Sequence, residues 1–315
     1  MRASVVIVAA LLGIACDGEV ADEYGAGPPA RRPDPPRFDC ALGGPARSFE
    51  GRDAALAQNA VVVHDASGRA TLHRLDAPTE PALALPDRVL ALSHHDGGWV
   101  AVTPSRVLQL APNGDVEWEA SFDVEATDAA VTLDALRGWL VLRDAEDEIS
   151  LHDLDLVAHE VGPATSVGRG RGRLLVAPQR ASWVAPGATT HLEAGASPVA
   201  GRAVALVGDQ VLYTAPDRTG IWVGEDHPVR VTRGDASAEG TVATGLGSRL
   251  VIAYASEGDL FVQPADVAEG ALGEPVLVAA AAAPTQIVAS GERFWVTWER
   301  APDRVEVRAG ECRGD

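Results

Sequence analysis

The sequence has few cysteines and no lysine. Only three of its 315 residues are Cys, and a chain of this length buries about three quarters of its extended surface on folding. A core of that size needs no dense disulfide framework, so the small disulfide-rich scaffolds are excluded. All 26 basic residues are Arg, a bias that we attribute to genomic base composition and that carries no functional weight.

Positive charge is also scarce. The chain has 45 acidic residues against 26 Arg, which gives a formal charge of -19 at pH 7, and the acidic excess is spread along the chain. Such a chain repels anionic polymers and phospholipid surfaces. We therefore expect no nucleic-acid partner.

Long apolar runs are absent except for one near the N-terminus. Residues 5–15 (VVIVAALLGIA) form an uncharged run that follows a single Arg. The run is about half of the roughly 20 residues that a membrane-spanning helix needs, and its position is typical of a secretory signal peptide. We expect residues 1–15 to be that signal peptide and the mature chain to have no transmembrane helix.

A cysteine follows this run directly. The segment 12–16 (LGIAC) resembles the lipobox of bacterial lipoproteins, in which the Cys is diacylated and becomes the mature N-terminus. The resemblance implies lipid attachment at Cys16 and an exported protein anchored to the inner or outer membrane of a bacterial envelope. The alternative is ordinary signal-peptidase cleavage after Ala15. Residues 17–37 contain five Pro, so we expect residues 16–37 to be the lipidated Cys with a disordered linker.

A repeat runs through residues 38–315. Short apolar runs recur 35 to 44 residues apart, each followed by an alternating run, and they begin at Val61, Trp99, Trp139, Leu174, Val211, Leu250 and Phe294. The apolar run is typical of a strand buried on both faces and the alternating run of a half-exposed strand. Strand-like segments before and after them give four strands per repeat. The pattern predicts an all-β, seven-bladed β-propeller with four-stranded blades; a solenoid of β-arches, whose ends need not meet, is the alternative.

The last repeat is one strand short. Only seven residues follow the strand predicted at 305–308, so we expect residues near 46–50 to supply the missing strand and to close the ring from the N-terminal side. Cys40 and Cys312 flank this junction and are the pair left once Cys16 carries lipid, which predicts a disulfide between them. Two unpaired thiols are the alternative.

One repeat carries a narrower resemblance. Residues 106–119 (RVLQLAPNGDVEWE) resemble a blade of the quinoprotein-type (PQQ-like) propellers, a family that includes the periplasmic lipoprotein of the outer-membrane barrel-assembly machinery. The shared element runs from Gly114 to Trp118. The resemblance supports a propeller; we transfer neither quinone binding nor an assembly role, and expect no cofactor.

Local motifs of chemistry are absent or weak. The chain has no Gly-x-Ser-x-Gly, His-Glu-x-x-His, Gly-Lys-Ser/Thr or Cys-x-x-Cys. Residues 167–172 (VGRGRG) imitate a phosphate loop without a following helix pattern, residues 94–96 (HHD) have no further metal ligand at suitable spacing, and the acidic residues 143–148 lack the spacing of a Ca²⁺ loop. We predict turns at all three, an architectural role for the repeat-equivalent His73 and His152, and no catalytic or metal residue.

The loops between second and third strands share one rim of the predicted ring with the loops that join consecutive blades. The candidate binding rim consists of Asp144, Glu146, Asp147, Arg180, Arg218, Asp259, Glu299 and Arg300. Because rigid scaffolds carry function on such loops, we expect a monomeric, non-catalytic envelope lipoprotein that binds a protein, peptide or glycan partner. The alternative is an envelope hydrolase or lactonase-type propeller enzyme that uses rim carboxylates or bound calcium. Carboxylates converging with a His at the mouth of the channel would favour the enzyme; we expect small or scattered side chains there.

Overall fold

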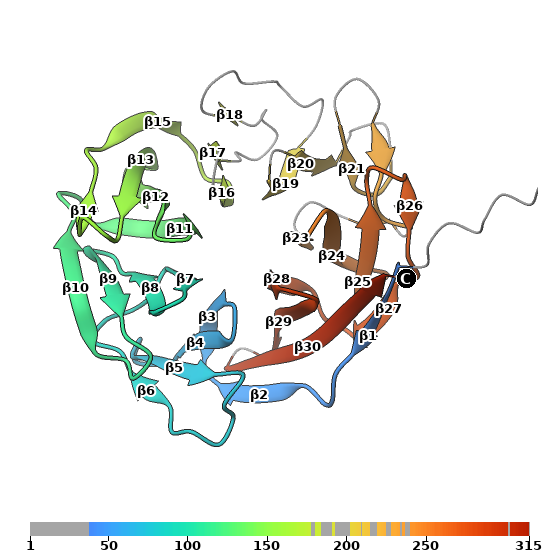
Figure 1. Ribbon diagram of the computed structural model, residues 1–315, viewed down its shortest axis with the longest axis horizontal. Helices are drawn as coiled ribbons and strands as arrows, with labels where there is room; N and C mark the ends of the chain where they lie inside the picture. Colours follow the sequence, from blue (N-terminus) through green and yellow to red (C-terminus); the bar gives the residue numbers. More distant parts are fainter. Residues whose placement is uncertain are drawn as a thin grey trace, which may run out of the picture. The chain divides into compact units, whose positions relative to one another are not determined.

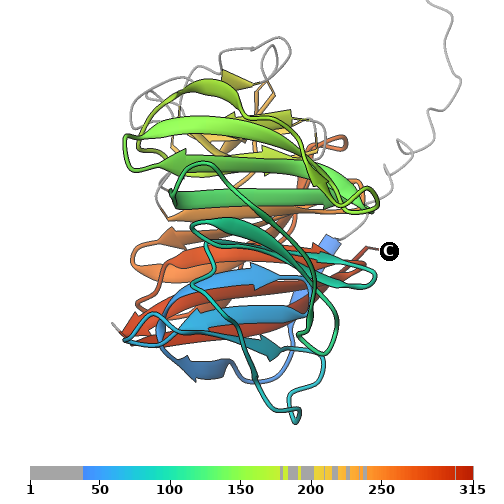
Figure 2. The same ribbon diagram turned by 90° about the vertical axis from the view of Figure 1, so that its left-hand side faces the viewer.

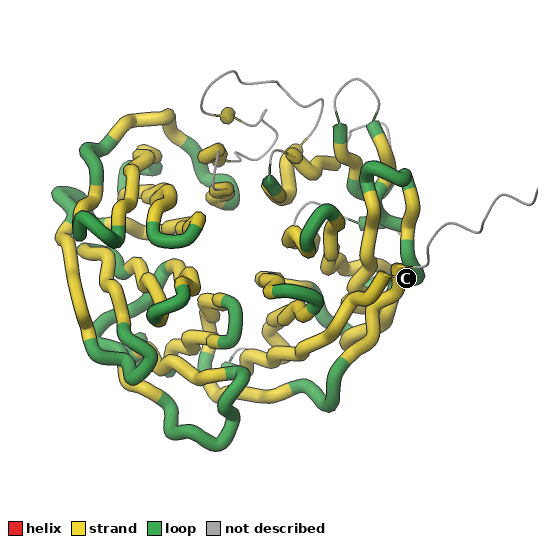
Figure 3. Tube along the Cα trace, in the orientation of Figure 1, coloured by secondary structure: helices red, strands yellow, loops and turns green. Residues whose placement is uncertain are grey.

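The computed structural model describes residues 38–177, 180–183, 191–192, 202–208, 210–214, 219–224, 228–233, 235–236, 240–301 and 303–314. The described chain consists of strands joined by turns and loops (Figure 3). Across these ranges no helix has the length and apolar character to cross a bilayer. The predicted signal peptide, Cys16 and the linker lie outside the described residues.

Consecutive strands pair in antiparallel sheets. The first sheet contains β3 (Arg52–Ala57), β4 (Ala60–His64), β5 (Ala70–Arg74) and β6 (Leu83–Ala84). The second contains β7 (Ala91–His95), β8 (Gly98–Val102), β9 (Arg106–Leu110) and β10 (Val116–Ser121). The third contains β11 (Ala126–Asp134), β12 (Arg137–Asp144), β13 (Glu148–Asp155), β14 (Glu160–Val161) and β15 (Thr165–Arg169).

The remaining sheets continue in the same order. The fourth contains β16 (Leu174–Ala177), β17 (Arg180–Trp183) and β18 (His191–Leu192). The fifth contains β19 (Arg202–Val207), β20 (Gln210–Thr214), β21 (Trp222–Val223) and β22 (Val229–Arg230). The sixth contains β23 (Thr241–Leu246), β24 (Arg249–Ser256), β25 (Asp259–Asp266), β26 (Ala271–Leu272) and β27 (Val276–Ala279). The last contains β28 (Pro284–Ser290), β29 (Arg293–Ala301) and β30 (Arg304–Gly314), with β1 (Phe38–Leu42) and β2 (Arg47–Glu50) paired to β30.

The prediction of seven four-stranded blades is wrong. Six sheets have the four or five strands of a blade, whereas the fourth sheet has three strands within the described ranges. The run at Leu174 was expected to be a second strand, but β16 is the first strand of its sheet. The segment before it, β15, pairs with β13 and so belongs to the preceding sheet. The spacing of the apolar runs could not reveal this, because both assignments keep the same period.

The sheets stand around a common axis (Figure 1) and follow one another as layers when seen from the side (Figure 2). Their innermost strands make contact in the order β3, β7, β11, β16, β19, β23 and β28, and β28 contacts β3 again. This closed ring of antiparallel sheets is a β-propeller. It excludes the solenoid, in which the first and last repeats remain apart.

The core lies between neighbouring sheets. The second strands β4 and β8 are buried along their whole length, as their unbroken apolar sequences predict. Leu72 and Leu108 meet in the core between the first two sheets, and Trp99 lies there with 2% of its surface exposed. The Trp99 indole Nε1 donates a hydrogen bond to Asn59 Oδ1 of the neighbouring sheet at 3.3 Å. Large side chains thus pack one sheet on the next, as predicted.

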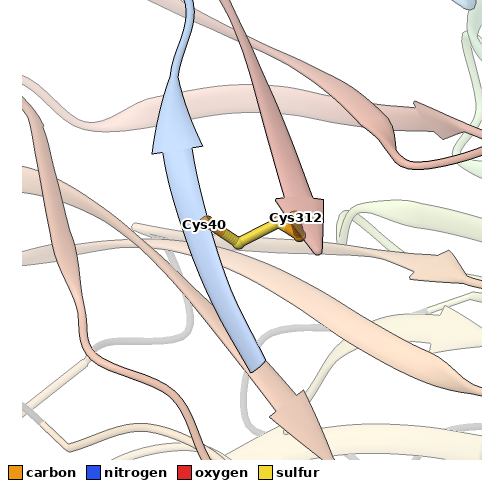
Figure 4. Close-up of a disulfide and its surroundings, with 2 residues drawn as sticks. All are labelled: Cys40 and Cys312. Carbon is orange, nitrogen blue, oxygen red and sulfur yellow. A yellow bond between two sulfur atoms is a disulfide. The ribbon is translucent and has the colours of Figure 1, made fainter. Parts of the chain in front are cut away.

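The two ends of the described chain complete the last sheet. β2 pairs with the first half of β30, as expected for residues 46–50, and β1 pairs with its second half. Cys40 and Cys312 are opposite each other in β1 and β30 and form a disulfide (Figure 4). The predicted disulfide is confirmed, and the alternative of two unpaired thiols is excluded.

Candidate functional site

The ring has two faces. The turns between second and third strands, such as β12–β13, lie at one face, together with the first residues of the innermost strands; this face is called the rim face. The turns between first and second strands, such as β11–β12, lie at the opposite face. Two contacts show that the innermost strands begin at the same face: Arg88 at the start of one sheet pairs with Asp53 of its neighbour at 3.3 Å, and Arg173 reaches the Thr241 carbonyl at 2.7 Å.

A cavity of about 560 Å³ occupies the ring axis. Every innermost strand contributes to its wall, and most of the side chains are Ala, Val, Leu or Ile. The ionisable side chains among its described lining residues are Asp128, Arg173 and His94. Asp128 lies near the start of β11 and His94 near the end of β7, so the carboxylate and the imidazole are at opposite ends of the cavity. The described lining therefore brings no pair of carboxylates together with a His.

Asp128 is held by neighbours at the cavity mouth. Its Oδ1 accepts a hydrogen bond from the Ala129 amide at 2.9 Å, and its Oδ2 accepts one from Arg143. Burial raises the pKa of the Asp128 carboxyl, while attraction to the Arg143 guanidinium opposes the rise. A carboxyl of raised pKa in a cavity is a recognised mark of functional sites. The Asp128 carboxylate, however, already forms an ion pair with Arg143.

The glycine-rich segment at residues 167–172 lies beside Arg143 and accepts hydrogen bonds from its guanidinium through backbone carbonyl groups. Arg143 donates to the carbonyl oxygens of Gly170, at 3.3 Å, and of Gly172. A phosphate loop presents amide N–H groups to an anion, whereas this segment presents carbonyls to a cation. The segment begins in β15 and runs into the turn before β16. The predicted turn therefore begins only after Arg169, because residues 167–169 belong to β15.

The acidic turn between β12 and β13 gathers three of the predicted rim residues. Asp144 Oδ1 accepts hydrogen bonds from the amides of Glu146 and Glu148, both at 2.9 Å. Asp147 pairs with Arg171, whose side chain is 82% exposed. Glu146 is exposed and forms no ion pair with a described residue. The Asp144 carboxylate therefore stabilises the turn, whereas the Glu146 carboxylate is exposed to solvent.

Three other predicted rim residues lie near the closure of the ring. Asp259 begins β25 and accepts a hydrogen bond from the Ala281 amide at 3.0 Å. Glu299 Oε1 accepts the amide of Asp53 in the first sheet at 3.3 Å. Arg300 pairs with Glu306 at 3.1 Å. Of the remaining two, Arg180 begins β17 but its side chain is not described, and Arg218 lies outside the described residues.

The ion pairs formed within the second and third sheets at this face were not predicted from the sequence. Arg106 binds Asp87 and also Glu119, at 2.7 Å, and Arg143 binds Asp128. Asp87 and Asp128 each lie at or just before the start of an innermost strand. A charged residue before several of the inner apolar runs, such as Asp87 and Asp128, was the signal that could have revealed them.

The histidines outside the rim make structural contacts, and the turn predicted at residues 94–96 is wrong for His94 and His95, which end β7. His95 is 5% exposed and its Nδ1 accepts the Gly97 amide at 3.0 Å. His152 is buried and bonds the Gly162 carbonyl at 3.1 Å, while His73 packs against Phe49 with ring centroids 4.6 Å apart. Within the described ranges, no group of three or more His, Cys, Asp or Glu side chains could hold a metal ion.

Comparison with known proteins supports the fold alone. No protein-family model and no curated protein sequence matches the chain. Solved structures do. The β-propeller domain of the trilobed protease from Pyrococcus furiosus has a TM-score of 0.57 at 10% identity, covering 86% of this chain and 98% of that domain.

Two further propellers are similar at the same level. BBS1N in complex with ARL6DN has a TM-score of 0.51 at 10% identity, covering 85% of this chain and 91% of that chain. The N-terminal domain of Nup159 has a TM-score of 0.51 at 8% identity, covering 87% and 96%. The chain shares the β-propeller fold with these proteins. At such identities the likeness transfers neither activity nor partner.

Proposed function

We propose that this chain is a non-catalytic envelope lipoprotein whose rim face binds a protein, peptide or glycan partner. The observation that carries the proposal is that exposed carboxylates at the rim face form no ion pair with a described residue. Several Arg side chains described there form ion pairs with carboxylates, as in the pairs Arg143–Asp128 and Arg300–Glu306. Exposed carboxylates such as Glu146 and Glu299 accept no cation among the described contacts. The remaining negative charge favours a positively charged protein surface as the partner.

The cavity supports binding over catalysis. Its described walls are mostly small and aliphatic, and Asp128 is already bonded to Arg143 and to a backbone amide. A hydrolase needs a positioned base and a second polar group at the reacting atoms. The similar propeller BBS1N forms a complex with another protein, which is in keeping with a binding role for such a scaffold.

The direction of chain entry supports tethering through Cys16. Phe38, the first described residue, pairs with Gly314 at the end of β30, far from the β29–β30 turn. The described chain therefore begins at the face opposite the rim, which is compatible with a tether through Cys16 that leaves the rim face open to a partner.

Two experiments test the proposal. Intact-mass analysis of the envelope form should show a chain that starts at Cys16 and carries a diacylglyceryl group, and a Cys16→Ala variant should lack it. Cleavage after Ala15 without added lipid would overturn the anchoring.

The rim is tested by charge reversal and affinity capture from the native envelope. A variant with Glu146→Arg and Glu299→Arg should lose the partner that the native chain retains. The matched control reverses two exposed acids of the opposite face, Asp115→Arg and Glu269→Arg, and should retain it. Equal retention by both variants would contradict rim binding.

A further inference from the structure

A second concave surface lies at the opposite face, at the end of the third sheet. It is a groove of about 690 Å³ between the β11–β12 turn and the chain that leaves β13. Its walls come from residues 134–139 and from Asp153, Leu154, Asp155 and Val157. It shares no residue with the rim face or with the axial cavity.

Two aliphatic side chains stand exposed in this groove. Val157 is 68% exposed and Leu136 is 39% exposed, and both line its wall. The other exposed large hydrophobic residues among the described ones, Val116, Val124 and Leu277, lie outside it. Exposed apolar side chains that share a concave surface mark interaction sites more often than scattered ones do.

The local backbone holds these side chains outward. Asp155 Oδ1 accepts hydrogen bonds from the amides of Val157 and Ala158, both at 2.9 Å, which fixes the turn after β13. Ala135, next to Leu136, has φ of 55°, a conformation that costs an L-residue about 1 kcal/mol or more. The turns are thus ordered by their own contacts, and the exposure of Val157 and Leu136 is a fixed feature.

The charges around the groove are unbalanced. Arg137 is the cation of its wall and pairs with Asp155 at 2.9 Å. Asp134 and Asp153 are exposed and form no ion pair among the described residues. Asp153 lies opposite Trp139 in the β12–β13 register, so a carboxylate and an indole flank the same end of the groove. An apolar wall beside a carboxylate and an indole is complementary to a peptide segment in which an aliphatic side chain is followed by Arg or Lys.

We propose that this groove docks a partner protein through an extended segment in which an aliphatic side chain is adjacent to Arg or Lys. The aliphatic side chain packs on Val157 and Leu136, and the cation pairs with Asp153 and Asp134. Charge complementarity disfavours a second copy docked groove to groove, because the same acidic groove would meet like charge there, and the net charge of -19 favours a more basic partner. The site is separate from the proposed rim function and does not depend on it.

The test is fluorescence polarisation with a labelled acetyl-Leu-Arg-Leu-Arg-amide peptide and the native full-length chain. The acidic counterpart acetyl-Leu-Glu-Leu-Glu-amide is the probe for non-specific apolar binding. The basic peptide should bind at least tenfold more tightly than the acidic one, and its affinity should fall as salt rises. Equal affinity for the two peptides, or no binding of either, would overturn the proposal.

Substitutions in the groove test whether the basic peptide binds there. Val157→Asp should weaken binding of the basic peptide about tenfold by removing the apolar contact. Asp153→Asn should weaken it severalfold at low salt and less at high salt. The matched control Val116→Asp changes a valine of 44% exposure outside the groove and should leave affinity unchanged. Circular dichroism melting checks that each variant is folded.

Three further outcomes would contradict the proposal. Equal losses in Val157→Asp and Val116→Asp would show that binding is not at the groove. Sedimentation velocity that shows a dimer in the native chain and a monomer in Val157→Asp would assign the groove to a second copy. Loss of binding in the Glu146→Arg and Glu299→Arg variant, with the groove intact, would place the peptide at the rim instead.

Discussion

Arg143 joins the third sheet to the mouth of the central cavity by its bond to Asp128, fifteen residues earlier in the chain. The Arg143 side chain is 16% exposed and that of Asp128 is 38% exposed. The same guanidinium also bonds the carbonyls of the segment before β16. One side chain thus connects the acidic turn, the cavity and the next sheet.

Substitutions at Asp128 should measure this connection. Asp128→Ala should lower the free energy of unfolding by about 1–2 kcal/mol, because Arg143 loses its charged acceptor while staying largely buried. Asp128→Asn keeps an acceptor and should cost less than about 1 kcal/mol. Urea denaturation followed by tryptophan fluorescence gives both values. Arg171→Ala removes an exposed pair and should change stability by less than about 0.5 kcal/mol; a loss equal to that of Asp128→Ala would refute the role of burial.

Stability should fall as the pH drops below about 6.5. Burial lowers the pKa of His73, His94, His95 and His152 below the ordinary 6.5. The unfolded chain therefore binds protons at these sites at a higher pH than the folded chain does. Their contribution is complete above pH 6.5 and is lost progressively as the pH falls through the lowered pKa values.

The urea midpoint measured from pH 7.5 to pH 5 tests this dependence. The midpoint should fall as the pH is lowered. His152→Gln should make the midpoint depend less on pH, because the substitution removes one of the four imidazoles. A midpoint that is constant or that rises over this range would show that the buried imidazoles are not the controlling groups.

The disulfide should contribute several kcal/mol. Cys40 and Cys312 are 272 residues apart, and a bridge that closes so long a loop removes much of the entropy of the unfolded chain. The Cys40→Ser, Cys312→Ser variant should lose about 3–5 kcal/mol, and a reducing agent should destabilise the native chain but not this variant. Equal urea midpoints for the oxidised native chain and the variant would contradict the prediction.

Gly98 should tolerate no side chain. Its φ is 143°, and a Cβ at this position would overlap the carbonyl oxygen of Leu110 in the neighbouring strand. Gly98→Ala should therefore cost more than about 3 kcal/mol, or prevent folding. Gly247 has φ of 64° with open space around it, so Gly247→Ala should cost only about 1 kcal/mol. Thermal melting of both variants compares them; similar losses would show that backbone conformation, and not overlap, limits both sites.

Local sequence was informative wherever a local property decides the structure. The apolar run at Val61–Val63 and the alternating run after it predicted β4 and β5, because burial of one or both faces imposes its period on the residues. The missing strand of the last repeat pointed to residues 46–50, which form β2 against β30. The same reasoning failed at Leu174, since period alone does not say which sheet a strand joins.

The candidate binding surfaces could be identified only from the tertiary structure. Six of the eight predicted rim residues have described side chains, and the structure divides them into turn-forming groups such as Asp144 and outward charges such as Glu146. The bond of Arg143 to Asp128 and the groove at Val157 had no motif, because each joins segments that only the pairing of strands brings together.

The sequence by itself determined that this chain is a closed all-β repeat with Cys40 and Cys312 at the junction. Hydrophobic periodicity is a local property that survives in the linear order of residues, so strands and their approximate number could be read from it. Only the tertiary structure decided how many sheets are complete, which strand of each sheet faces the axis, and where charge and apolar surface remain unpaired. Those outcomes depend on contacts between residues far apart in the chain, and no local pattern encodes them.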